Sequence, residues 1–247
     1  MKRWVICFVL VAMTGLVRAD APASKPAADP TKAAVKIGKD GQPDANFMKL
    51  HQEFLARGKE PADVLFLGDS ITAGWKGTGA KEIFAANFDK YHAANFGIGG
   101  DRTQHVIWRI ENGELDNIKP KVTVLMIGTN NLSTDAPDKI ADGVEKIVKE
   151  IREKTGSKVL LLAIFPRGEK PDAEQTKMLR GKIAVINEKL QTLDDGKNIK
   201  YLDIGDKFLE PDGTIKPTIM KDFLHLTKEG YQREADAIGP VIEEMVK

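Results

Sequence analysis

Five short runs rich in apolar residues, each followed by a longer stretch with helical periodicity, constrain the fold of this chain more than any other feature. Nearly continuous apolar runs are typical of parallel strands that are covered on both faces. Strands that alternate with helices in this way form a parallel sheet between two helical layers. We therefore predict an α/β fold, a three-layer α/β/α sandwich around a five-stranded parallel sheet. The expected strands are Val64–Leu67, His92–Phe96, Val122–Ile127, Val159–Phe165 and Ile199–Ile204.

The helical stretches complete a single domain. In the first of them Phe47, Leu50, Phe54 and Leu55 form one apolar stripe, as expected of an amphipathic helix. A chain of 247 residues, 42% of them hydrophobic, can bury a full core in one such domain. The expected helices are Asn46–Arg57, Thr103–Asn112, Pro137–Lys154, Ala173–Leu193 and Thr227–Val246.

The pattern of residues 1–19 predicts a secretory signal peptide. The basic start Met1–Arg3 precedes the apolar run Trp4–Val17, and Val17-Arg18-Ala19 places small or modest residues at the positions that signal peptidase needs. The apolar run has about 14 residues, whereas a membrane span needs ~20. An uncleaved anchor is the alternative. We expect cleavage after Ala19, a secreted or periplasmic protein, and no integral membrane span in the mature chain.

Residues 20–42 are expected to form a flexible tether that precedes the domain at 43–247. The tether is rich in Ala, Pro and Lys and has no large apolar residue before Val35, so it cannot bury a core. The only cysteine, Cys7, lies in the predicted signal peptide. The mature chain therefore has no disulfide, no thiol nucleophile and no thiolate metal ligand.

The balance of charges argues against a nucleic-acid partner. Lys and Arg total 37 against 36 Asp and Glu, and the two signs are interspersed. Binding to nucleic acid or to an anionic membrane usually needs a basic excess or a basic patch. The expected partner is a small-molecule or polysaccharide substrate, and the oligomeric state is left open.

Three glycine-containing turns follow predicted strands at the edge where parallel sheets bind their ligands. They are Gly68–Ser70, Gly97–Asp101 and Gly128–Asn131. Glycine permits dihedral angles that are closed to other residues and lets the backbone approach a ligand. The alternative is that these are merely tight turns, in which Gly, Asn and Asp are common.

Of the four serines, only Ser70 directly follows a predicted buried strand at this edge. Ser24 lies in the tether, Ser133 follows the turn after the third strand, and Ser157 belongs to the opposite end of the sheet. Ser70 also opens toward a helix whose N-terminal amides could hold an oxyanion. It is therefore the candidate nucleophile.

Of the four histidines, only His225 has a carboxylate three residues before it in a loop, that of Asp222. This spacing lets one short turn carry both a base and the group that orients it. An imidazole with an ordinary pKa near ~6.5 suits proton transfer near neutral pH. Asp-x-x-His strings also occur at many helix starts, so the string alone does not define a catalytic pair.

Four ordered blocks resemble those of the SGNH (GDSL) hydrolases: Gly68–Thr72, Gly100, Gly128–Asn130 and Asp222–His225. The closer likeness is to the catalytic subunits of intracellular platelet-activating factor acetylhydrolase. It is carried by Asn95–Leu115, Pro166–Gly168 and Asp222–Tyr231, and it runs from about Asp63 to the C-terminus.

The resemblance implies a flavodoxin-like sandwich and a role for each matched residue. Ser70 would be the nucleophile, and His225 would be the base, held by Asp222. The backbone amides of Ser70 and Gly100 and the side chain of Asn130 would form the oxyanion hole.

No cofactor and no metal are expected. Gly97–Arg102 lacks the third glycine of the dinucleotide fingerprint, and Gly74–Lys81 departs from a phosphate-binding loop by one position. Thr72 stands where the nucleophile elbow of α/β-hydrolases needs glycine. A His-x-x-x-His or comparable ligand cluster is also missing from the sequence.

The predicted function is a serine esterase that removes a short acyl group, foremost acetyl, from a carbohydrate or lipid. The predicted signal peptide distinguishes this chain from the cytosolic animal relatives and favours an ester substrate outside the cytoplasm. Ile71, Thr129 and Leu224 adjoin the catalytic residues and are expected to wall the acyl side. Alternatively, Ile71 turns into the sheet and Leu224 packs under the loop. The rival functions are a lysophospholipase or thioesterase with a longer acyl slot, and an inactive carbohydrate-binding module.

Overall fold

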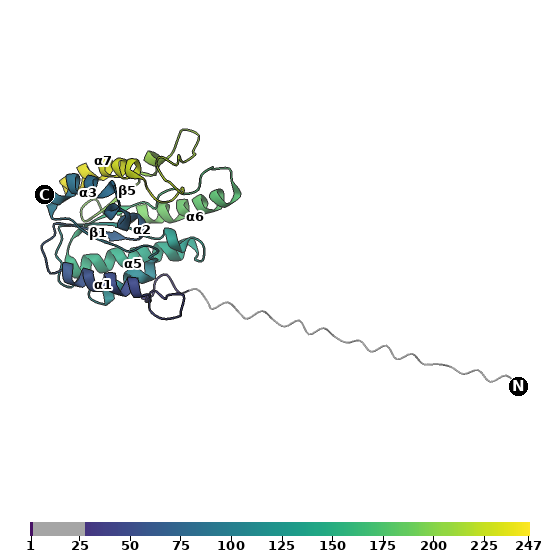
Figure 1. Cartoon of the computed structure of the whole chain (residues 1–247), viewed down its shortest axis with the longest axis horizontal. Coiled ribbons are helices and arrows are strands. Elements are labelled where there is room, and N and C mark those ends of the chain that lie inside the picture. The colour runs from purple at the N-terminus through teal and green to yellow at the C-terminus, as the bar shows by residue number, and fades with distance from the viewer. Residues whose placement is uncertain (2–27) are drawn as a thin grey trace.

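Five parallel strands form the centre of the molecule, and helices cover both faces of the sheet (Figure 1). The computed structural model describes residue 1 and residues 28–247. The order of the strands is β2-β1-β3-β4-β5, and all neighbours are parallel. This is the flavodoxin-like order, so the predicted fold is confirmed. The strands are β1 (Val64–Gly68), β2 (Ala94–Gly97), β3 (Val122–Met126), β4 (Lys158–Leu162) and β5 (Ile199–Leu202).

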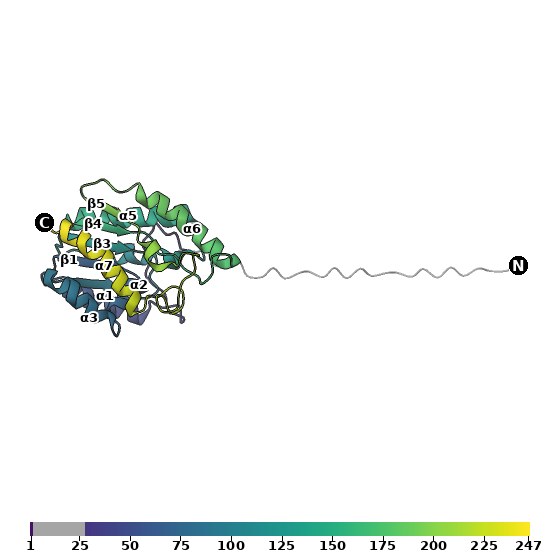
Figure 2. The same ribbon diagram turned by 90° about the horizontal axis from the view of Figure 1, so that it is seen from above.

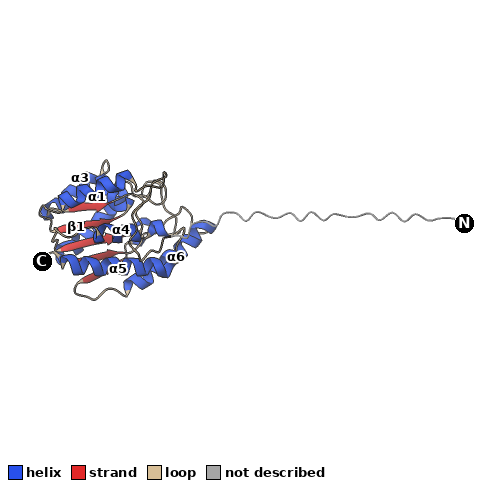
Figure 3. Cartoon of the chain, turned by 90° about the horizontal axis from the view of Figure 1, so that it is seen from below, coloured by secondary structure: helices blue, strands red, loops and turns tan. Residues whose placement is uncertain are grey.

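Alternate residues of each strand face two different hydrophobic cores. In β1, Leu65 and Leu67 belong to one core, whereas Val64 and Phe66 belong to the other. The first core is covered by α1 (Ala45–Arg57), α4 (Thr103–Glu111), α5 (Pro137–Thr155) and α6 (Glu174–Gln191) (Figure 3). The second is covered by α2 (Ser70–Ala73), α3 (Ala80–Phe88) and α7 (Lys228–Met245) (Figure 2).

Two details differ from the expected elements. The expected helices do not include α3, although its apolar residues Ala80, Ile83, Phe84 and Phe88 have helical spacing. Phe84 lies 5.7 Å from the Trp75 ring, and Phe88 lies 5.0 Å from the Phe66 ring. The fourth strand ends at Leu162, and the three apolar residues after it form a buried loop. Within the described residues, no helix has both the length and the apolarity needed to cross a membrane.

Residues 28–42 are not the flexible tether that their composition predicts. The Thr103 hydroxyl donates a hydrogen bond to the Pro30 carbonyl at 2.8 Å, and Val35 packs against the first core. The tether prediction is wrong here because backbone hydrogen bonds and small apolar contacts hold the segment on α4. The predicted signal peptide, apart from its first residue, and residues 20–27 lie outside the described residues.

The strand order creates a natural binding crevice at β1. The chain adds β2 on one side of β1 and then returns to add β3 on the other side. Loops that leave the carboxyl ends of such neighbouring strands diverge and leave room for a ligand. The three glycine-containing turns of the sequence follow β1, β2 and β3 and therefore meet at this edge.

Candidate active site

Ser70 is held at the carboxyl end of β1 by a tight strand-to-helix turn. Glycine is needed at position 68, because a Cβ there would lie 2.4 Å from the Met126 backbone oxygen. The Asp69 side chain accepts a hydrogen bond from the Ile71 N–H at 3.0 Å and so caps α2. Ser70 is the first residue of that helix, at the binding edge of the sheet.

The three side chains predicted as a catalytic set are in hydrogen-bond contact. Oγ of Ser70 lies 2.9 Å from Nε2 of His225. Nδ1 of the same ring lies 2.6 Å from Oδ2 of Asp222. Because an ionised carboxylate only accepts, we assign the ring proton to Nδ1, which leaves Nε2 free to accept the Ser70 proton. This is the geometry of a serine–histidine–aspartate triad.

The loop that carries Asp222 and His225 is held by its own hydrogen bonds. Oδ1 of Asp222 accepts from the His225 N–H at 2.7 Å and from the Leu224 N–H at 3.3 Å. Phe223 has a φ of +58°, in the left-handed region that few residues with side chains adopt. Its carbonyl accepts from the Gly168 N–H at 2.9 Å. These contacts fix the direction of both functional side chains.

The surroundings of Asp222 favour its ionised form. Partial burial raises the pKa of Asp222, but hydrogen bonds from the side chain and backbone of His225 outweigh this and hold it below its ordinary value. The half-buried Arg167 guanidinium adds a positive charge nearby. Its Nη1 donates to the backbone oxygen of Thr129 at 3.3 Å and to the Thr129 hydroxyl at 3.2 Å.

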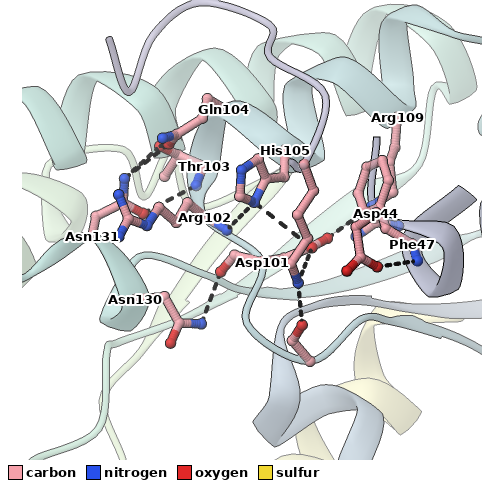
Figure 4. Close-up of polar contacts among 12 residues, drawn as sticks. Asp44, Phe47, Asp101, Arg102, Thr103, Gln104, His105, Arg109, Asn130 and Asn131 are labelled. Atoms are coloured by element: carbon pink, nitrogen blue, oxygen red, sulfur yellow. Dashed lines mark hydrogen bonds and ion pairs between the residues drawn. The ribbon is translucent and has the colours of Figure 1, made fainter. Parts of the chain in front are cut away.

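The predicted oxyanion donors lie on turns that meet at the binding edge. Nδ2 of Asn130 donates to the Asp101 carbonyl at 2.9 Å, which leaves its second N–H for a ligand (Figure 4). Gly100 has a φ of +74°, a conformation that favours glycine. Within residues 28–247, the N–H groups of Ser70 and Gly100 donate to no protein acceptor. Both remain available to a negative oxygen.

A cavity of about 500 Å³ opens beside Ser70 and His225. Its other lining residues are mostly small or cationic: Gly74, Gly77, Thr78, Ala80, Lys221, Leu226, Thr227, Lys228 and Tyr231. A second cavity, of about 510 Å³, lies between α6 and β5 and contains none of the predicted site residues. The described part of the chain holds no group of three or more His, Cys, Asp or Glu that could bind a metal ion.

Comparison with known proteins identifies the family. The model of the GDSL-like lipase/acylhydrolase family matches residues 66–233, which contain Ser70, Gly100, Asn130 and the Asp222–His225 loop. The chain belongs to this family. Human platelet-activating factor acetylhydrolase IB subunit alpha2 is 41% identical to it over 228 residues, 91% of this chain and 93% of the relative. The human alpha1 subunit is 39% identical over 210 residues, 83% of this chain and 84% of the relative.

Solved structures of other GDSL esterases share the fold. A putative acylhydrolase from Bacteroides fragilis superposes with a TM-score of 0.68 at 24% identity, over 82% of this chain and 98% of the other. An acetylxylan esterase from Geobacillus stearothermophilus gives a TM-score of 0.57 at 19% identity, over 73% of this chain and 94% of the other. Together with the family match, the curated relatives identify the chain as an ester-cleaving hydrolase.

The structure does not bring Ile71, Thr129 and Leu224, the residues expected to wall the acyl side, to the cavity of this GDSL hydrolase. Ile71 is 2% exposed and belongs to the core that contains Trp75, and Leu224 packs against that core. Thr129 is buried, and its hydroxyl accepts from Arg167. Ile71 is therefore a packing residue, as the alternative states. A role for Thr129 and Leu224 beside the acyl group stays a prediction.

Sequence reasoning missed a buried ion-pair cluster beneath the turn after β2. Arg109 is fully buried, and its Nε lies 3.0 Å from Oδ2 of Asp101. Its Nη1 donates to the Phe96 carbonyl at 3.1 Å and to Glu114. Phe96, Asp101, Arg109 and Glu114 all lie in the Asn95–Leu115 block that carries the family resemblance. Which of its charged residues would be buried depends on packing.

Proposed function

We propose that this hydrolase cleaves short-chain acyl esters, with Ser70 as nucleophile, His225 as general base and Asp222 as the group that orients the base. One observation carries the proposal. Two consecutive hydrogen bonds, of 2.9 Å and 2.6 Å, join Ser70 Oγ to His225 and His225 to Asp222. A serine hydroxyl is a poor nucleophile until a base takes its proton, and this arrangement supplies that base.

The reaction follows from these contacts. Nε2 of His225 accepts the Ser70 proton as Oγ attacks the ester carbonyl carbon, and it then gives the proton to the leaving alcohol. Water hydrolyses the acyl-enzyme by the same proton route. The negative oxygen formed in each step accepts hydrogen bonds from the Ser70 and Gly100 N–H groups and from Asn130. Such preformed donors are usually the largest contribution to the rate.

The acyl group is proposed to be acetyl, and the alcohol a carbohydrate or a lipid. Curated relatives at 39–41% identity are named as acetylhydrolase subunits, which supports the acetyl group. We place the enzyme outside the cytoplasm, on the basis of the apolar run Trp4–Val17 and the cleavage site that Val17 and Ala19 form. An N-terminal residue Asp20 on protein recovered from the periplasm or medium of an expressing bacterium would support this location, and an intact Met1 would contradict it.

A panel of chromogenic esters of one alcohol tests the function. Acetate, butyrate and octanoate esters are compared by kcat/KM for the wild type and for Ser70→Ala. We expect the highest value for acetate and no measurable turnover in a Ser70→Ala variant that unfolds at the wild-type temperature. A preference for octanoate would support the lysophospholipase or thioesterase alternative. A folded wild type that hydrolyses none of the three would support the carbohydrate-binding alternative.

A further inference from the structure

Two cations from different parts of the chain contact the turn after β2, Gly99–Asp101. The Asp101 side chain between them is completely buried. Arg109, from α4, places Nε 3.0 Å from Oδ2, and Lys36, from the segment before α1, places Nζ 3.5 Å from Oδ1. Lys36 Nζ also donates to the backbone carbonyl of Gly99. Figure 4 shows Asp101 beside His105 and Arg109 of α4.

Lys36 is itself held in place. The Ala34 N–H donates to the Gln104 carbonyl at 3.1 Å, and the Asp44 N–H donates to the Lys36 carbonyl at 2.8 Å. Val35 packs against the first core. The Lys36 side chain is only 21% exposed, so the ammonium lies against the protein rather than in solvent.

The turn that Lys36 contacts carries one of the three proposed oxyanion donors, the Gly100 N–H, and orients a second, the Asn130 amide. Gly100 lies between Gly99 and Asp101, and a Cβ on it would come within 3.1 Å of Lys36 Nζ. The Asp101 carbonyl accepts the hydrogen bond that fixes the Asn130 amide. A shift of this turn would therefore move both the Gly100 N–H and the Asn130 side chain.

Lys36 adds a second cation to a cluster that contains two buried carboxylates, those of Asp101 and Glu114. Arg109 also pairs with the buried Glu114, so without Lys36 one guanidinium faces two buried carboxylates. Burial raises the pKa of Asp101, and the charges of Arg109 and Lys36 oppose this rise. The resulting pKa is about 6. His105 Nδ1 lies 3.9 Å from Asp101, but it accepts a hydrogen bond from the Arg102 N–H at 3.1 Å. Burial, and after it Lys36, lower the His105 pKa to about 3, so the ring beside Lys36 is neutral.

We propose that Lys36 is a positioning residue for the oxyanion hole. Its ammonium holds the Gly99–Asp101 turn, and through this turn the Gly100 N–H and the Asn130 amide, in the geometry that binds the negative oxygen. The inference rests on the proposed serine-esterase function. Lys36 lies before residues 66–233, which the family model matches, so this contribution comes from the N-terminal segment of this chain.

The test compares Lys36→Met, which removes the charge and keeps an unbranched side chain one heavy atom shorter, with Lys39→Met. Lys39 is an exposed lysine of the same segment and serves as the matched control. With a chromogenic acetate ester, we expect kcat of Lys36→Met to fall by ~10- to 100-fold, since small misplacements of catalytic groups cost that much. KM should stay within about threefold of wild type, because the donors act mainly in the transition state. Lys39→Met should match the wild type.

Combining Lys36→Met with Asn130→Ala tests whether Lys36 acts by positioning Asn130 or lowers kcat independently of it. Because Lys36 acts partly through Asn130, the double variant should lose less than the product of the two single losses. A fully multiplicative loss, a change in KM alone, or a kcat within about twofold of wild type would overturn the proposal. So would a loss of activity that only follows the folded fraction in thermal unfolding.

Two further measurements keep the outcome interpretable. Should Lys36→Met not fold, Lys36→Gln is measured in the same way against the same criteria. Ser70→Ala distinguishes the two proposals. If Ser70→Ala retains activity, the proposed function itself fails. If Ser70→Ala is inactive and Lys36→Met turns over normally, only the role of Lys36 is rejected.

Discussion

The side-chain amide of Asn130 donates a hydrogen bond to the backbone carbonyl of Asp101 at 2.9 Å. This contact ties the turn after β3 to the turn after β2, which lie on either side of β1 and therefore of Ser70. One N–H of the amide makes this hydrogen bond, which fixes the plane of the amide before any substrate binds. Donors that are oriented in advance need no reorganisation when the negative charge develops.

Asn130→Ala should lower kcat by ~10²–10³ with little change in KM, because it removes a donor that matters mainly in the transition state. Steady-state kinetics on the acetate ester, corrected for the folded fraction, measure the effect. Near-normal turnover per folded molecule together with a lower melting temperature would instead assign Asn130 a structural role in its turn.

Asp222→Asn should lower kcat by roughly 10³–10⁴, since an amide can donate to Nδ1 and so favour the ring tautomer that cannot accept the Ser70 proton. Asp206→Asn, on an exposed carboxylate, is the control and should be unaffected. Full activity of Asp222→Asn would mean that another group holds the imidazole.

Ile71→Ala should destabilise the protein by roughly 2–4 kcal/mol, because Ile71 is 2% exposed within the core. The ratio of kcat/KM for acetate over butyrate should not change, since this side chain does not line the cavity beside Ser70. Urea unfolding and the ester panel test both statements. A shift of the ratio toward butyrate would place Ile71 at the acyl group after all.

Glu234→Gln should stabilise the protein more as the pH rises. Glu234 is almost fully buried, and burial raises its pKa to about 8. From about pH 4 to about pH 8 the folded carboxyl keeps a proton that the unfolded chain releases, so the wild type loses stability as the pH rises through this window. Glutamine has no proton to lose.

Melting temperatures of Glu234→Gln and wild type, measured across this pH range, check the prediction. The difference should grow with pH and then level off. Glu243→Gln, an exposed carboxylate on the same helix, serves as control. Curves for Glu234→Gln and wild type that run parallel throughout would show that the Glu234 carboxyl titrates alike in the folded and unfolded chains.

The layers of the fold and the edge at which the turns meet follow from local patterns in the sequence. Apolar runs and helical periodicity are local properties, and they predicted all five strands. A parallel sheet places the turns that follow β1, β2 and β3 at one edge, which groups Gly68–Ser70, Gly97–Asp101 and Gly128–Asn131. The resemblance to the SGNH hydrolases singled out Gly100 and Asn130 within these turns. The Asp222-x-x-His225 spacing gave the base and its carboxylate for the same local reason.

Contacts between segments that are far apart in the sequence could not be predicted from local patterns. Ser70 and His225 are separated by 155 residues, and their hydrogen bond exists because α7 packs back across the sheet beside β1. Residues 28–42 look like a tether in composition, yet they are ordered by hydrogen bonds to α4 and bring Lys36 to Asp101. Which way Ile71 points was equally open, since periodicity within a four-residue helix cannot tell a core-facing side chain from a site-facing one. Local pattern fixes which elements form, whereas the free energy of packing one element against another decides which side chains meet.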